Sequence, residues 1–270
     1  MMEGKSKIDI QHPEAWELLV SIEDRMVNYI LYTPAVAGSL AMGQVERADE
    51  SLQALEDAVY DTPELLNEYK RVRVMVHSQH FVMLPQDTTD DDCTMLLHEA
   101  FPDDDGETCV CPMPQNGVKI AYLLPQGLQA FLGRTFNYPV LFHHLYPLCE
   151  HIKEHLSSDN RSRMFLSVSE QQMDLVIIRE GTLQCANTYQ FSNADDAVYY
   201  ALNAWRTHHL DQLTDELQIT GHNEQCAAMM PKLREFVKYV MPFAFPAAAM
   251  QLGRNAIQAP IELILLALCE

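Results

Sequence analysis

Two stretches of this chain of 270 residues repeat one another at a shift of 146 positions, which aligns Val20-Ser21-Ile22 with Leu166-Ser167-Val168. Each stretch alternates apolar and polar side chains on both sides of a short polar turn, a pattern typical of a β-hairpin. The same shift superposes three alternating positions of the second hairpin strand, Val27, Tyr29 and Leu31, on Met173, Leu175 and Ile177. An internal duplication constrains the fold more than any single segment, because it requires two copies of one unit.

The segments that follow each hairpin also agree. After each hairpin the pattern predicts a third strand, then a helix whose apolar residues recur every three or four positions, then a further strand. The second helix opens at Ser192-Asn193 with Asp195 close behind, which resembles a capping box. Both halves therefore have the predicted order strand, strand, strand, helix, strand, in an α/β fold with mixed sheets. The identity between the halves is low, so a chance similarity of two meanders is the alternative to duplication.

A polar break at residues 157–162 separates the halves, and we place the domain boundary there, giving domains 14–158 and 159–270. The first domain contains an acidic insertion, residues 86–117, which we expect to be mostly solvated around one short apolar helix. The last predicted helix opens at Pro260 and is apolar nearly all round, so it is buried either inside the domain or in an interface between copies. A homodimer through this C-terminal helix is the corollary.

The charge of the chain excludes some partners. Lys and Arg number 18 against 38 Asp and Glu, a formal charge of −20 with 48% hydrophobic residues, which is the composition of a folded, acidic protein. Such a surface repels phosphates, so we expect no nucleic-acid partner. The longest apolar run, residues 261–269, contains Glu262 and is too short to span a bilayer, so no direct membrane insertion is expected. Seven cysteines at irregular spacing indicate reduced thiols and a cytoplasmic location.

Other clusters of reactive side chains favour structural roles. His151 and His155 share a helix face, a spacing that zinc can use, but Pro147 interrupts the segment and no third ligand is fixed, so no metal is expected. Cys109 and Cys111 have the wrong spacing for a thioredoxin-type redox pair. We therefore assign no catalytic residue.

The duplicated pattern and several local motifs suggest a family. The motifs are Phe81-Val82-Met83-Leu84-Pro85, the segment from Asn187 through Phe191 to Asp196, Val198-Tyr199-Tyr200-Ala201-Leu202 and Ile219-Thr220-Gly221. In these motifs, over residues 14 to about 250, the chain resembles an uncharacterised Bacteroidetes domain-of-unknown-function family with an actin-like ATPase fold. This fold consists of two ribonuclease-H-like domains around a nucleotide cleft. More distantly the chain is similar to the cytosolic actin-like proteins of type IV pilus and type II secretion assembly.

The resemblance implies which positions would face a nucleotide. Working actin-like ATPases carry an Asp-x-Gly motif at the turn of each first hairpin, where glycine lets backbone N–H groups approach the phosphates and aspartate holds Mg²⁺ through water. This chain has Ser21-Ile22-Glu23 and Ser167-Val168-Ser169 instead. We expect the cleft to be retained with the fold but to lack the residues that bind the phosphates and Mg²⁺. Its degenerate nucleotide-binding positions are Ser21, Glu23, Asp24, Ser167, Ser169, Glu170 and Gly221.

Two functions follow from these expectations. The first is a non-catalytic interaction scaffold or pseudo-ATPase with an unknown protein partner and no cofactor. The alternative is an enzyme, a divergent Mg-dependent ATPase or sugar-kinase-like phosphotransferase, in which Glu23, Asp24 or Glu170 holds Mg²⁺ and Gly221 admits the adenine of ATP. The two differ in whether the cleft binds a nucleoside triphosphate.

Overall fold

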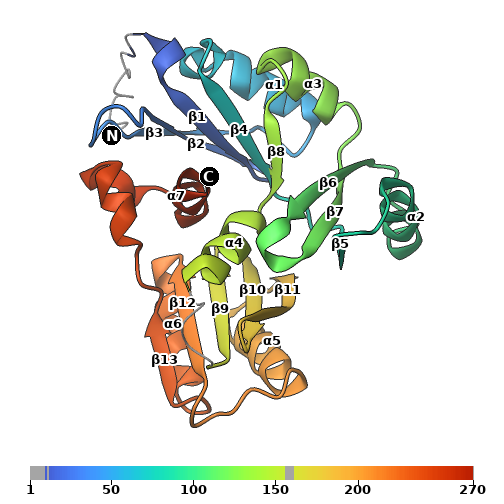
Figure 1. The fold of residues 1–270 in the computed structure, drawn as a ribbon, viewed down its shortest axis with the longest axis vertical. Helices are drawn as coiled ribbons and strands as arrows, with labels where there is room; N and C mark the ends of the chain where they lie inside the picture. Colours follow the sequence, from blue (N-terminus) through green and yellow to red (C-terminus); the bar gives the residue numbers. More distant parts are fainter. Residues whose placement is uncertain (1–9, 11, 156–160, 270) are drawn as a thin grey trace.

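A computed structural model describes residue 10, residues 12–155 and residues 161–269. It contains two five-stranded sheets, one in each half, and a third sheet of three strands beside the first (Figure 1). The predicted boundary between residues 158 and 159 lies outside the described residues. In the part of the chain that is described, no helix is both long and apolar enough to cross a bilayer.

The first sheet has the strand order β3-β2-β1-β4-β8. Strands β1 to β3 form an antiparallel meander, and β4 and β8 continue the sheet parallel to β1. The strands are β1 (Glu17–Ile22), β2 (Met26–Tyr32), β3 (Ala41–Glu46), β4 (Arg71–Val76) and β8 (Val140–His143). Strand β3 begins only at Ala41, because residues 36–38 form a bend and a turn, in which Gly38 has a φ of 79°.

The second sheet repeats the first, with the order β11-β10-β9-β12-β13. Its hairpin has the register that the sequence shift of 146 requires, since Ile22 pairs with Val27 and Val168 pairs with Met173. The strands are β9 (Arg163–Val168), β10 (Gln172–Arg179), β11 (Thr182–Gln190), β12 (Glu216–Gly221) and β13 (Tyr239–Pro242). The predicted duplicated α/β architecture with mixed sheets is confirmed.

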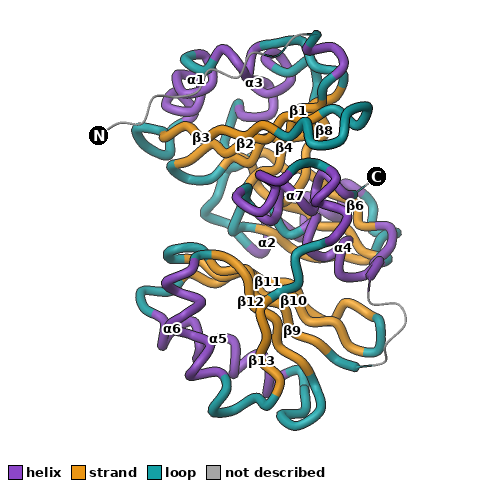
Figure 2. Tube along the Cα trace, turned by 90° about the vertical axis from the view of Figure 1, so that its left-hand side faces the viewer, coloured by secondary structure: helices purple, strands orange, loops and turns teal. Residues whose placement is uncertain are grey.

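Helices cover the outer face of each sheet (Figure 2). On the first sheet these are α1 (Leu52–Tyr60) and α3 (Leu128–Thr135), and on the second α5 (Ala194–Thr207) and α6 (Asn223–Leu233). The side chain of Ser51 accepts a bond from Ala54 N at the start of α1, and that of Asn193 accepts from two backbone N–H groups at the start of α5. These caps fix where both helices begin.

The acidic insertion, residues 86–117, contains the predicted short helix, α2 (Asp90–Ala100), and also a strand, β6 (Glu107–Met113), and many of its residues are exposed. With the flanking strands β5 (Phe81–Pro85) and β7 (Val118–Leu124) it forms a small folded unit, in which the third sheet packs against α2. The acidic run 90–92 forms the first turn of α2, where aspartates interact favourably with the helix dipole. Cys93, Leu97, Ala121 and Leu123 form its core.

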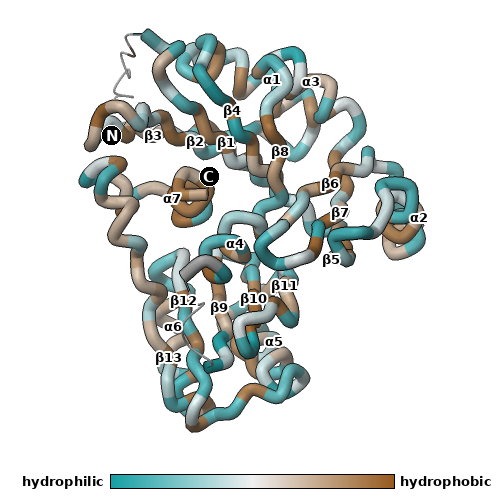
Figure 3. The backbone as a smooth tube through the Cα atoms, in the orientation of Figure 1, coloured by the Kyte–Doolittle hydropathy of each residue, from teal (hydrophilic) through white to brown (hydrophobic). Residues whose placement is uncertain are grey.

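The C-terminal segment does not stay with the second sheet. After β13 the chain returns through two 3₁₀ turns, Ala247–Gln251 and Arg254–Gln258, to α7 (Ile261–Leu268). This helix lies between the two halves in both views and is apolar along its length (Figures 1, 2 and 3). Its residues Leu263, Ile264 and Leu266 pack in a cluster with Leu19 and Ile30 of the first sheet.

This position bears on two expectations. Residues 247–268, which the sequence assigned to the domain 159–270, pack on the inner face of the first sheet. Leu263, Ile264, Leu265 and Leu266 are fully buried by the chain itself, and the homodimer through α7 stays a prediction. Beside it, α4 (Tyr146–His155) packs on α7 and contacts strands of the second sheet.

A buried arginine fastens α7 to the first sheet. Arg73 on β4 is 4% exposed and donates hydrogen bonds to the carbonyl oxygens of Leu266, at 2.5 Å, and Cys269, at 3.0 Å. Its other terminal nitrogen lies 3.1 Å from the carboxylate of Glu17 and 2.7 Å from the hydroxyl of Tyr32. The guanidinium therefore satisfies the carbonyls at the C-terminal end of α7.

Candidate functional site

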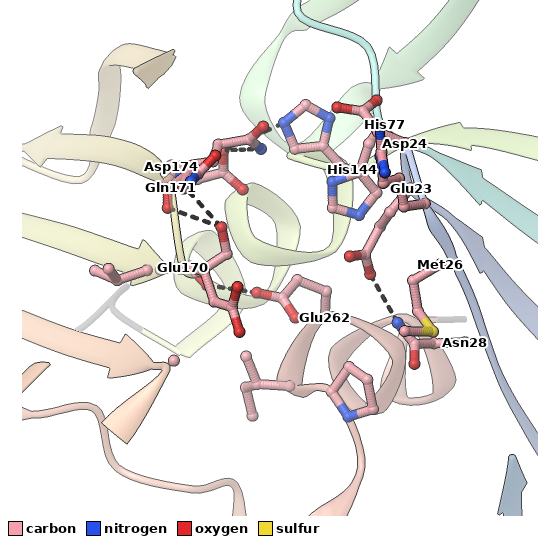
Figure 4. Close-up of a pocket in the computed structure, with 18 of the residues that line it drawn as sticks. Glu23, Asp24, Met26, Asn28, His77, His144, Glu170, Gln171, Asp174 and Glu262 are labelled. Atoms are coloured by element: carbon pink, nitrogen blue, oxygen red, sulfur yellow. Dashed lines mark hydrogen bonds and ion pairs between the residues drawn. The ribbon is translucent and has the colours of Figure 1, made fainter. Parts of the chain in front are cut away.

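A large cleft lies between the two halves. Its volume is about 2020 Å³, and both hairpin turns, the connection after β4 and the C-terminal segment line it (Figure 4). It is bounded by the first turn of α7, at Glu262, and by the ends of β1 and β9. The fold thus brings the two duplicated turns to one cavity.

The structure places six of the seven predicted cofactor positions in the lining of this cleft. They are Glu23, Asp24, Ser167, Ser169, Glu170 and Gly221. Ser21, the seventh, does not line it. The Ser21 side chain is buried and its hydroxyl lies 3.2 Å from Nε2 of His77.

The first backbone N–H of each turn is already bonded within its hairpin. The N–H of Glu23 donates to the carbonyl of Met26 at 2.9 Å, and that of Ser169 donates to the carbonyl of Gln172 at 2.8 Å. A phosphate-binding turn needs several N–H groups that point at the ligand. Neither of these two N–H groups is available for that purpose.

Gly221 ends β12 and is explained by packing of the backbone. Its φ is +115°, and a Cβ atom at this position would lie 2.0 Å from the carbonyl oxygen of Val168. Only glycine fits such a close approach of two strands. The residue is therefore required by the sheet whether or not the cleft binds a nucleotide.

Two partly or fully buried carboxylates, Glu23 and Glu262, line the cleft. Glu23 accepts a hydrogen bond from Asn28 at 2.8 Å, and Glu262 accepts one from the hydroxyl of Ser167 (Figure 4). Burial raises the pKa of Glu23 above its ordinary value, with a further rise from the charge of Glu262. Burial also raises the pKa of Glu262, and the charge of Asp174 adds to this effect. The carboxylates therefore disfavour one another's ionisation.

A chain of polar side chains connects the two halves at the base of the cleft. The rings of His77 and His144 stack with centroids 4.7 Å apart, and Nε2 of His144 lies 3.3 Å from Oδ1 of Asp174 on β10. Thr188 on β11 donates to the same Asp174 oxygen at 2.8 Å. Burial lowers the pKa of His77 to about 3, with a further contribution from the charge of His144. Burial opposes ionisation of Asp174, but attraction to His144 holds its pKa below the ordinary value.

The sequence did not single out these residues as a group. His77, His144, Asp174 and Thr188 lie far apart in the chain, and Glu262 belongs to a helix whose position the pattern could not place. His77 precedes a polar run and His144 follows another histidine, and neither context indicates that the two rings contact one another. Their contacts depend on how the halves assemble, a property that local periodicity does not encode.

The lining is strongly acidic. Among its described residues eight carboxylates oppose a single guanidinium, that of Arg25, and no lysine is present. The carboxylates are those of Glu23, Asp24, Glu50, Asp104, Glu170, Asp174, Asp196 and Glu262. A triphosphate carries several negative charges, so this cleft does not fit the nucleotide that the fold family implies.

The described carboxylates of the cleft are not arranged as ligands of a metal ion that could offset their charge. Over the described residues, no group of three or more His, Cys, Asp or Glu side chains is arranged to hold a metal ion. His151 is buried, while the side chain of His155 lies outside what the structure describes. Glu23, Asp24 and Glu170 all line the cleft, yet they form no such cluster.

Comparison with solved structures gives the fold. The chain is similar to a Bacteroides thetaiotaomicron protein with an actin-like ATPase fold and unknown function, with a TM-score of 0.81, 21% identity, and coverage of 98% of this chain and 100% of that one. A PilM–PilN type IV pilus biogenesis complex matches with a TM-score of 0.50 and 12% identity over 96% of this chain and 100% of the other. The cytoplasmic domain of EpsL from the type II secretion system of Vibrio cholerae matches with a TM-score of 0.47 and 12% identity, over 92% and 97% of the two chains.

The first of these similarities shows that the chain has the actin-like ATPase fold. No curated protein matches its sequence. Residues 5–240 match the family described as protein of unknown function DUF3822. The matched segment runs from before β1 to the middle of β13 and so includes both hairpins of the cleft. The chain belongs to the DUF3822 family.

Proposed function

We propose that this chain is a pseudo-ATPase, a non-catalytic interaction protein that retains the actin-like fold without its nucleotide chemistry. The observation that carries the proposal is the set of acidic side chains on both hairpin turns, Glu23 and Asp24 in one and Glu170 in the other. Glu23 stands at the glycine position of the first Asp-x-Gly motif, where the fold family admits phosphate oxygens, and Asp24 and Glu170 directly follow the two motif positions. Like charges in this place repel a triphosphate, and no cluster of ligands among the described residues would bring a metal between them.

The C-terminal helix supports the same proposal. In the first turn of α7, Glu262 bonds to Ser167, one of the predicted phosphate-side positions. The helix therefore adds a further carboxylate to the base of the cleft instead of a cation.

An assembly role in the cytoplasm completes the proposal. One structure of similar fold is the PilM–PilN type IV pilus biogenesis complex, in which the fold occurs within a protein assembly. Six cysteines are free thiols, which suits a reducing compartment; they are Cys93, Cys109, Cys111, Cys149, Cys185 and Cys226. The charge of −20 supports a protein partner in preference to a nucleic acid or an anionic membrane.

A hydrolysis assay tests the absence of catalysis. Purified chain is incubated with Mg²⁺ and each of the four common nucleoside triphosphates, and released phosphate is measured for the wild type and for Glu23→Ala. We expect the same background rate from both proteins. Turnover that Glu23→Ala abolishes would overturn the proposal and support the divergent ATPase or phosphotransferase.

A further inference from the structure

The cleft has features that suit a ligand of another kind. It is lined by eight carboxylates and one guanidinium in the described part of the chain. No ion pair within 4 Å is found among the described residues for Glu23, Asp24, Glu50 or Glu262, although the charges of Asp24 and Glu50 act on the nearby guanidinium of Arg47. Asp24 and Glu50 are exposed at the rim, where a ligand can reach them.

The base of the cleft concentrates this charge. Glu23 and Glu262 both line this cavity, burial raises the pKa of each, and the charge of Glu262 raises the pKa of Glu23 further. A positive group placed there would relieve this repulsion. The acidic base therefore favours ligands that carry an ammonium or guanidinium group.

One wall of the same cleft is apolar. Met26 and Met42 from the first sheet and Phe245, Ile257 and Ile261 from the C-terminal segment line it. Ile257 is 66% exposed, an unusual position for a large aliphatic side chain beside a cavity. A ligand that was only a cation would leave this wall exposed to water, so an occupant needs apolar side chains as well.

The size of the cavity decides between a small molecule and a segment of protein. Its volume of about 2020 Å³ exceeds the range of roughly 300–1,000 Å³ that small-molecule sites occupy. A segment of polypeptide with both basic and apolar side chains fits the volume, the charge and the apolar wall together.

We propose that the inter-domain cleft binds a basic, amphipathic segment of a protein partner, with its lysine or arginine side chains toward Glu23, Glu170 and Glu262 and its apolar side chains on the wall that includes Ile257. This proposal rests on the proposed function, since a nucleotide and such a segment would occupy the same cavity. The charge that excludes the triphosphate is the charge that attracts the segment.

The test uses a twelve-residue peptide of alternating lysine and leucine, with the full chain and isothermal titration calorimetry. Three neutralised cleft residues, Asp24→Asn, Glu50→Gln and Glu170→Gln, are exposed, so their combination is compatible with folding. The matched control neutralises three exposed carboxylates outside the cleft, Glu68→Gln, Glu99→Gln and Glu235→Gln. Both triple variants change the net charge equally, and circular dichroism verifies that both are folded.

We expect the wild type and the control to bind the peptide with similar affinity. The cleft variant is expected to bind about tenfold more weakly, because each of the three neutralised carboxylates is expected to reduce the affinity by about twofold. Ile257→Ser weakens binding severalfold, and raising the salt concentration weakens it further. Spermine, which has charge without apolar side chains, binds at least tenfold more weakly than the peptide.

Three results would overturn the proposal. The first is that both triple variants bind the peptide with equally weakened affinity. The second is that a peptide with glutamate in place of each lysine binds the wild type as tightly as the lysine peptide does. The third is that spermine binds as tightly as the peptide. The first would mean attraction to overall charge, the second would remove the charge argument, and the third would mean a small polycation site. None of them depends on whether ATP binds, so a failure here is distinct from a failure of the proposed function.

Discussion

Removing the guanidinium of Arg73 is expected to release the C-terminal helix from the first sheet. Arg73 joins four partners, the carbonyls of Leu266 and Cys269, the carboxylate of Glu17 and the hydroxyl of Tyr32. Arg73→Met keeps a side chain of similar length without charge. It leaves the Glu17 carboxylate, 6% exposed, buried without its cation.

The magnitude follows from that uncompensated charge. Breaking a buried ion pair by removing one partner costs about 3–5 kcal/mol, whereas replacing both partners is often nearly neutral. We therefore expect Arg73→Met to lower the free energy of unfolding of the first half by about 4 kcal/mol. The double variant Arg73→Met with Glu17→Gln is expected to recover at least about 2 kcal/mol of that loss.

Urea unfolding can follow each half separately, because one tryptophan lies in each. Trp16 adjoins β1 and Trp205 lies on α5, so Trp205→Phe gives a background in which fluorescence reports the first half. Arg71→Met is the matched control, since Arg71 is exposed on the same strand and its loss is expected to cost less than about 0.5 kcal/mol. Hydrogen exchange of the last turn of α7 is expected to accelerate in Arg73→Met.

The account of Arg73 would be refuted by a loss below about 1 kcal/mol for Arg73→Met, a value typical of an exposed pair. It would equally be refuted if the double variant lost as much stability as the two single losses added together.

Three further outcomes are expected from the geometry of the cleft and its surroundings. Gly221→Ala, which places a Cβ on the Val168 carbonyl, destabilises the second half by about 3 kcal/mol or more, whereas Gly181→Ala, with a φ of +71° and open space around it, costs about 1–2 kcal/mol in urea unfolding. The pKa of His77 is lowered to about 3 in the folded chain, so between pH 6.5 and pH 3 the unfolded chain binds a proton at His77 that the folded chain does not. The free energy of unfolding of the wild type therefore falls as the pH falls through this range. His77→Gln flattens the stability–pH curve between these values, and an unchanged slope would contradict this role. The raised pKa of Glu262 contributes stability below about pH 4.5 that is lost as the pH rises, so Glu262→Gln, which retains an acceptor for Ser167, gains stability relative to the wild type between pH 4 and pH 7 in thermal unfolding.

Much of the fold could be predicted because its hairpins have clear local patterns. Strands next to a polar turn, such as residues 26–32, and helices with capped ends, such as the one after Asn193, carry their signal within a few residues. The duplication then fixed the topology, since a repeated unit implies a repeated sheet order. The short helix of the acidic insertion was predicted, but its start at the aspartate run and strand β6 were not, because a run of charges favours a helix start and a loop alike.

Features that depend on contacts between distant segments could not be predicted. The all-apolar sequence of α7 indicates burial but not the surface that buries it, and the cover turned out to be the sheet of the other half. Asp174 was counted only as part of a strand, although its position on β10 brings it to His144. Six of the seven predicted nucleotide-side positions line one cavity, and the hairpin turns that carry most of them are related by the duplication itself.

A titration of the purified chain with Mg²⁺-ATP tests the central claim most directly, because that claim is about binding in the inter-domain cleft. Mg²⁺ alone, titrated in parallel, accounts for any ion attracted by the carboxylates. The account predicts no heat of nucleotide binding up to millimolar concentration, since Glu23, Asp24 and Glu170 oppose the phosphates. Saturable binding at micromolar concentration, lost in a variant whose change lies in the hairpin turns, would contradict it and show that the cleft still binds nucleotide.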